Sequence, residues 1–150
     1  MLWRKKQKTV GWRNKDGKIE CTGLCKNECG TECPIWWNTT GLKQLQWKQF
    51  DEAIKCFKAA LDIAPDFSDA HNNLGTAYGH KGCDKEAHVC FLTANSLKPN
   101  SPPTLRGLVI SEMNLGMYQE ALHHCEELEA RSAGNVQSLK EQILECMKAD

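Results

Sequence analysis

The chain has 150 residues, of which 41% are hydrophobic and 25% are charged, and its formal net charge is zero. These values are ordinary for one soluble domain with a real core, and no stretch of about 18 residues is apolar enough to span a membrane. The charge is uneven, because residues 1–33 hold eight of the 19 Lys and Arg but four of the 19 Asp and Glu, which leaves a basic head at +4 and a body at −4.

The head contains a short stretch that predicts a β-hairpin. Residues 9–21 hold two short runs on either side of Asn14-Lys15-Asp16-Gly17. Asp-Gly between such runs is typical of a hairpin turn, because glycine accepts a positive φ without penalty. We therefore expect a small two-stranded ribbon, which is marginally stable by itself and needs something to hold it.

Four cysteines follow the ribbon and are candidates for holding it. They recur every fourth residue, at Cys21, Cys25, Cys29 and Cys33. The glycines between them disfavour a helix and favour turns that could fold four thiolates around one Zn²⁺, whose binding would fold the segment. Three-residue spacers lie within the range of zinc ligands, whereas iron–sulfur sites usually mix two and three. Zinc is therefore preferred, with an iron–sulfur cluster, disulfides and unliganded thiols as alternatives.

The cysteine count and the beginning of the chain together predict a cytoplasmic protein. Residues 1–12 are basic but are followed by neither an apolar run nor a small-residue cleavage site, so we expect no secretory signal. The nine cysteines are an odd number. Without export they are better explained as reduced thiols or metal ligands than as disulfides.

From Pro34 onward the sequence repeats itself with a period of about 34 residues. The recurring pairs include Gly41 and Gly75, Phe57 and Phe91, Pro65 and Pro99, Gly82 and Gly116, and Ala87 and Ala121. Within each unit, apolar and small residues follow the spacing of two helices, and the small ones fall where the helices cross. One such pair cannot bury its apolar face alone, so we expect a stack of pairs.

This helix–turn–helix period with a closing proline resembles the tetratricopeptide repeat family. The resemblance implies an all-α fold, a right-handed superhelical stack of three repeats over residues 34–67, 68–101 and 102–135. The apolar stripe of the following residues predicts a capping helix over 136–148. We expect residues 1–33 to form a separate Cys-rich hairpin or knuckle, and residues 34–150 to form the repeat domain.

Two of the three repeats depart from the family pattern. In the first, Gln44 stands in place of an aromatic residue and Lys48 in place of the turn glycine. In the third, Val109 replaces the crossing glycine and Cys125 replaces an aromatic residue. These departures concern how closely the helices cross, and the existence of each helix pair is still predicted.

The family resemblance also implies a binding surface on the first helix of each pair, which lines the concave side of a curved stack. Carried over to this sequence, the surface comprises Asn38, Leu42, Asn72, Asn73, Thr76, His80, Arg106, Ile110 and Asn114. An asparagine amide can donate to and accept from a peptide backbone at once, and Arg106 can bind a carboxylate through two N–H groups. The alternative is that Asn72 and Asn73 simply solvate a helix face.

No motif in the sequence supports catalysis. There is no Gly-rich phosphate loop, nucleophile elbow or HExxH sequence. The adjacent His123 and His124 point to different sides of a helix, and His71, His80 and His88 are interpreted as surface residues. We therefore predict a non-catalytic scaffold that binds a protein or peptide partner and no membrane. A basic head that contacts nucleic acid, disfavoured by the acidic body, and a small iron–sulfur redox protein are the alternative hypotheses.

Overall fold

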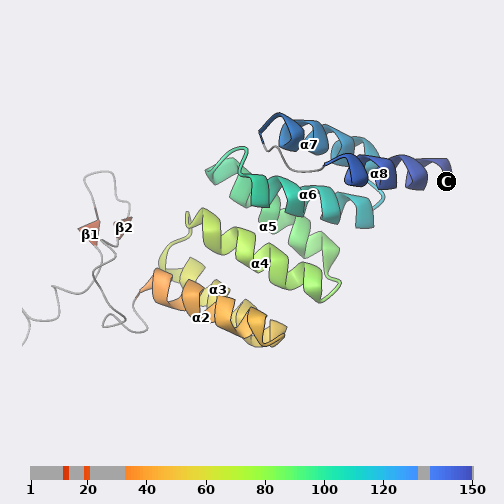
Figure 1. The fold of residues 1–150 in the computed structure, drawn as a ribbon. Helices are drawn as coiled ribbons and strands as arrows, with labels where there is room; N and C mark the ends of the chain where they lie inside the picture. Colours follow the sequence, from red (N-terminus) through yellow and green to blue (C-terminus); the bar gives the residue numbers. More distant parts are fainter. Residues whose placement is uncertain (1–11, 14–18, 21–32, 132–135, 150) are drawn as a thin grey trace, which may run out of the picture.

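A computed structural model describes residues 12–13, 19–20, 33–131 and 136–149 (Figure 1). Within these residues, seven helices follow a two-stranded ribbon, and the helices are α2 (Pro34–Gln46), α3 (Phe50–Ile63), α4 (Ser68–His80), α5 (Asp84–Leu97), α6 (Pro102–Asn114), α7 (Tyr118–Arg131) and α8 (Gln137–Ala149). Strands β1 (Trp12–Arg13) and β2 (Ile19–Glu20) pair antiparallel, with Trp12 opposite Glu20. This pairing agrees with the predicted hairpin.

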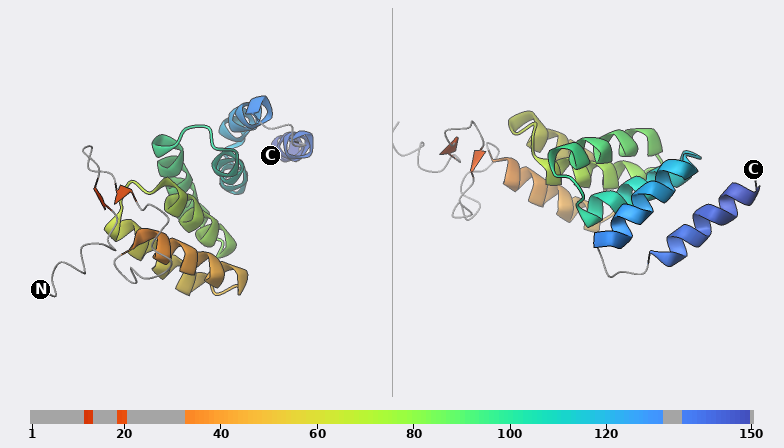
Figure 2. Two further views of the ribbon diagram at one scale, coloured as in Figure 1. Left: turned by 60° about the vertical axis from the view of Figure 1, so that its left-hand side comes forward. Right: turned by 90° about the horizontal axis from the view of Figure 1, so that it is seen from above.

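The helices are stacked in one row, from α2 and α3 at one end to α7 and α8 at the other (Figures 1 and 2). Each second helix packs against its own partner and against the first helix of the next pair. The first helices begin at Pro34, Ser68 and Pro102, so their starts are separated by one sequence period each. The prediction of an all-α stack of three helix pairs with a further C-terminal helix is therefore confirmed.

The turns inside the three pairs share one backbone conformation. Gly82 and Gly116 have φ values of 74° and 75°, in the left-handed region that glycine enters without a steric penalty. Lys48 stands at the equivalent position of the first pair and has a φ of 58°. The first pair therefore makes the same turn with a side chain that raises its cost by about 1 kcal/mol.

The two helices of a pair cross where a glycine faces a phenylalanine ring. A Cβ atom at Gly41 would lie 2.5 Å from Phe57 Cε1, so only glycine lets the helices approach this closely. Gly75 and Phe91 repeat the arrangement one unit later. In the third pair the two equivalent positions hold Val109 and Cys125, both with no exposed area. A larger residue on one helix is thus matched by a smaller one on the other.

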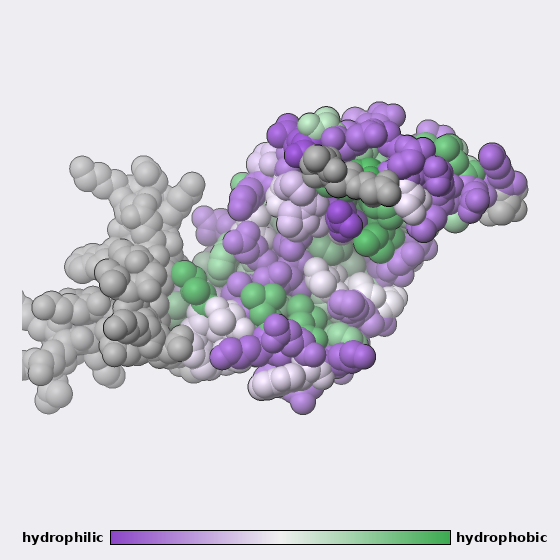
Figure 3. All heavy atoms as spheres, in the orientation of Figure 1, coloured by the Kyte–Doolittle hydropathy of each residue, from purple (hydrophilic) through white to green (hydrophobic). Residues whose placement is uncertain are grey.

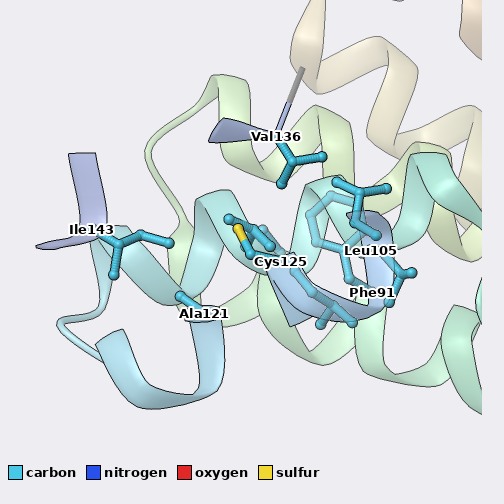
Figure 4. Packing of buried hydrophobic residues seen from close by; sticks show 10 residues of the cluster. Phe91, Leu105, Ala121, Cys125, Val136 and Ile143 are labelled. Atoms are coloured by element: carbon cyan, nitrogen blue, oxygen red, sulfur yellow. The ribbon is translucent and has the colours of Figure 1, made fainter. Parts of the chain in front are cut away.

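The larger of two hydrophobic clusters lies at the C-terminal end of the stack and joins α5, α6, α7 and α8. Figure 4 shows Phe91, Leu105, Cys125 and Ile143 among its members. Ile143 comes from α8 and has no exposed area, so α8 covers the apolar face that the last pair would otherwise expose to water. A smaller cluster joins α3 and α4 around Phe57.

Candidate functional site

A cavity of about 330 Å³ lies between α4, α5 and α6. Five of the nine predicted binding residues line it, and these are Thr76, His80, Arg106, Ile110 and Asn114. Residues so distant in the sequence meet here because α4 and α6 are the first helices of consecutive pairs. These two helices contact each other and both pack against α5. The repeat spacing thus brings more than half of the predicted surface into one cavity.

The apolar wall of this cavity is the ring of Phe91 on α5. The side chain is 5% exposed, and one glycine of α4 and one of α6 lie against it. A Cβ atom would lie 2.8 Å from Phe91 Cε1 at Gly75 and 2.5 Å from it at Gly107, which is well inside the normal separation of two carbon atoms. Because both positions lack a side chain, α4 and α6 can approach the ring closely. The backbone of these two glycines then forms part of the cavity wall.

Some polar side chains around the cavity already have partners within the chain, and others do not. Asn114 Nδ2 donates to Asp84 Oδ1 at 2.8 Å. The His80 imidazole stacks on the Phe50 ring of α3, with centroids 5.2 Å apart and planes 11° apart. Arg106 is exposed, and within the described part of the chain its guanidinium has no carboxylate partner. Arg106 is therefore the cationic group that a ligand in the cavity can reach.

The predicted asparagines of α2 and α4 lie outside the cavity, and two of them hydrogen-bond to each other. Asn73 Nδ2 donates to Asn38 Oδ1 at 2.9 Å, which joins the first helices of the first two pairs. The Asn72 Oδ1 atom is buried and has no hydrogen-bond partner among the described residues. Of this part of the predicted surface, Leu42 has the most open side chain, at 40% exposure. Figure 3 shows an apolar patch along the boundary of α2 and α4, surrounded by polar side chains.

One polar cluster was not predicted from the sequence. Glu112 of α6 is 1% exposed, and its Oε2 atom lies 2.9 Å from Nδ1 of His124 on α7. Its Oε1 atom lies 3.8 Å from Nδ1 of His88 on α5. The side chains of His88 and His124 are 14% and 16% exposed, so the interpretation of His88 as a surface residue is wrong. Both imidazoles face inward because the buried carboxylate between them needs partners.

Sequence reasoning also missed Gly107 and Asp84, which line the cavity beside the predicted residues. Gly107 is two residues before the position that the repeat period assigns to the crossing glycine. No periodic signal could have found it. Asp84 is the first residue of α5, where an acidic side chain is ordinary because it faces the positive end of the helix dipole. Because the helix dipole already accounts for an acidic residue here, the sequence provides no reason to predict its contact with Asn114.

Three of the four predicted zinc ligands, Cys21, Cys25 and Cys29, lie outside the described residues. The fourth, Cys33, is buried at the N-terminus of α2. Zinc binding therefore stays a proposal, and we expect about one zinc and no iron per chain in elemental analysis of anaerobically purified protein. Iron in place of zinc, or neither metal, would contradict it.

A family model described as a TPR (tetratricopeptide) repeat matches residues 45–82, from the end of α2 to just beyond α4. The chain contains tetratricopeptide repeats. Solved repeat domains have the same arrangement of helices. The first TPR domain of human RPAP3 superposes with a TM-score of 0.74 at 18% identity, covering 80% of this chain and 96% of that domain. The first TPR of Spaghetti (RPAP3), bound to the HSP90 peptide SRMEEVD, gives 0.71 at 18% identity, with 79% and 98% covered.

The curated relatives of this repeat protein are longer. The peroxisomal targeting signal receptor of Eremothecium gossypii is 35% identical over an alignment of 111 residues, which covers 67% of this chain and 19% of the receptor. The receptor of the same name from Candida albicans is 38% identical over 77 residues, 51% of this chain and 13% of that receptor. The chain thus spans less than a fifth of the length of these relatives. Among the described residues, no helix is both long enough and apolar enough to cross a membrane.

Proposed function

We propose that this tetratricopeptide repeat protein is a non-catalytic scaffold that binds an extended segment of a protein partner across α4 and α6. The observation that carries the proposal is the cavity in which Thr76, His80, Arg106, Ile110 and Asn114 converge. Two similar proteins support it. The Spaghetti domain was solved with a bound peptide, and the Eremothecium relative is named as a receptor for a targeting signal.

The side chains of the cavity indicate the chemistry of the bound segment. Arg106 offers two N–H groups in a plane, which matches a carboxylate. Beside it, Ile110 is 46% exposed and the Phe91 ring forms the apolar wall. A bulky apolar side chain would cover these two residues while an acidic group of the same segment meets Arg106. We propose a partner segment that carries both groups a few residues apart.

Three cysteines of α3, α5 and α7 support a non-catalytic role. Burial raises the pKa of Cys56 and Cys125 above the ordinary thiol value, and it raises the pKa of Cys90 to about 11. The thiolate is the nucleophilic form of cysteine, and such thiols stay protonated at neutral pH. These residues act as small apolar side chains of the core.

Replacing Arg106 with glutamate should weaken binding of the partner segment at least tenfold. The substitution removes a charge-assisted hydrogen bond worth about 1.5–3 kcal/mol and places a like charge beside the ligand carboxylate. Peptides would first be selected from a random phage-displayed library against the full chain, then synthesised and titrated by fluorescence anisotropy. Arg131→Glu is the matched control, because Arg131 is an exposed arginine at the end of α7, outside the cavity.

The proposal requires that selected peptides be enriched in an acidic and a bulky apolar residue, and that Arg131→Glu bind them as the unmodified chain does. Equal losses in the two variants would show that overall charge, and not the cavity, governs binding. A selection that enriches no peptide would argue against a peptide-binding role altogether.

A further inference from the structure

The buried carboxylate of Glu112 is held by two imidazoles. Within the described residues its ion-pair partners are His124, 2.9 Å away, and His88, 3.8 Å away, and neither a lysine nor an arginine reaches it. A carboxylate that is 1% exposed is costly unless it is paired. Imidazoles are the side chains whose ordinary pKa lies near neutral pH, so the pairing of Glu112 depends on the proton that His124 carries in their 2.9 Å contact.

These three residues connect consecutive repeats. His88 belongs to α5, the second helix of the second pair, while Glu112 and His124 belong to the two helices of the third pair. The contact between α5 and α6 is the boundary between the two repeats. In a stacked array, each repeat is stabilised largely by its neighbours. How well the carboxylate buried at this boundary is paired therefore contributes to how firmly the third repeat is stacked on the second.

The cluster also adjoins the candidate binding cavity through Ser111. This residue lines the cavity, and its Oγ atom donates to the Leu108 carbonyl at 3.0 Å and lies 3.5 Å from His88 Nδ1. The same ring nitrogen faces Glu112. His88 thus lies between a residue of the cavity wall and the buried carboxylate.

The remaining ionisable groups around the cluster come from α4, α7 and α8. Glu127 and Glu112 both act electrostatically on His124. Cys125 is acted on electrostatically by Lys140 of α8, Glu112, Glu129 and Glu126. Tyr78 of α4 packs against the same core. Neither Lys140 nor Tyr78 contacts the Glu112 carboxylate by an ion pair in the described residues, so the two imidazoles remain its compensating groups.

We infer that the buried Glu112–His124 pair, with His88 beside it, forms a proton-dependent latch at the boundary between the second and third repeats, and that this latch loosens as His124 loses its proton. The latch acts through charge balance in a buried site. It does not depend on which segment occupies the cavity, so it stands apart from the proposed function.

The direction of the pH dependence follows from His124. Its hydrogen bond to Glu112 raises its pKa, and burial opposes part of that rise. A group whose pKa is raised by folding adds stability that is fully present below its unfolded pKa, about 6.5. That stability is lost as the pH rises through the folded pKa. The folded array should therefore become less resistant to denaturant as the pH is raised from about 6 to about 8.

Urea unfolding of the full chain, followed by far-ultraviolet circular dichroism, tests the latch. Between about pH 5.5 and 8.5 we expect the urea midpoint of the unmodified chain to fall. His124→Gln should remove most of this dependence, and Glu112→Gln should do the same because it removes the charge but keeps an acceptor. His71→Gln is the matched control, because His71 lies on α4 and its ring contacts the Pro65 carbonyl, outside the cluster. Its midpoint should fall in parallel with that of the unmodified chain.

A second measurement keeps the inference testable if the buried variants fail to fold. Nitrogen-15 spectra of the imidazoles in the unmodified chain should show His124 titrating above the ordinary midpoint of about 6.5. Titration of His124 at or below that midpoint would overturn the latch. An undiminished pH dependence in His124→Gln would also overturn it.

Discussion

Replacing Phe91 with alanine should lower the free energy of unfolding by about 3–5 kcal/mol. The ring is 5% exposed and belongs to the cluster that joins α5, α6, α7 and α8. Its removal leaves a void between two glycines that have no side chains with which to fill it. The site cannot collapse easily, which favours the upper part of that range. Urea denaturation followed by circular dichroism would measure the loss.

Leu92→Ala is the control for Phe91→Ala. Leu92 is the next residue of the same helix and is 44% exposed, so its truncation should cost no more than about 1 kcal/mol. If the two variants lost similar amounts of stability, Phe91 would not be the close-packed centre that the structure describes.

Replacing Gly107 with alanine should destabilise the chain by about 1–2 kcal/mol, although alanine is the better helix former. The new Cβ atom would lie 2.5 Å from Phe91 Cε1. The ring has little room to move away, because it is 5% exposed and Gly75 of α4 also lies against it. The added methyl group must therefore push α6 and α5 apart, and the midpoint of urea unfolding should fall.

The chain offers a matched control in Gly79→Ala. Gly79 is a helical glycine of α4 with no atom within 4 Å of the position its Cβ would take. Alanine there removes the entropic penalty of glycine without a clash, so it should stabilise the chain by about 0.5 kcal/mol. The two substitutions are chemically identical and should have opposite signs. A stabilising Gly107→Ala would mean that α5 and α6 are not in close contact at this point.

Features that depend on the period were predicted well from the sequence. The three helix pairs, the turn at Lys48 and the crossing glycines Gly41 and Gly75 all follow from stepping one period along the chain. Five of the nine proposed binding residues meet in one cavity for the same reason, since equivalent positions of stacked helices face the same side.

Features that arise between repeats were not predictable in this way. Gly107 contacts Phe91 from the following repeat, at a position where the first two units carry no glycine. From the sequence alone, Glu112 is expected to be a solvent-exposed helix residue. Its burial is explained only by the positions of His88 and His124 beside it in the structure. The hydrogen bond between Asn38 and Asn73 was likewise not predicted, because each of the two amides by itself is equally well suited to binding a peptide. In each of these contacts, the sequence around each residue has a simpler explanation that does not involve the contact.

The exchange of Gly and Phe for Val and Cys at the third crossing constrains how such sequences can change. In all three pairs the two positions have the same separation along the chain, and the bulk that one residue gains the other loses. At Gly41 an added side chain would clash with Phe57, so we expect a change at one position of a crossing to require a change at the other. If each position is compared with the repeat pattern separately, Val109 and Cys125 count as two departures. In the packed structure they are one compensated change.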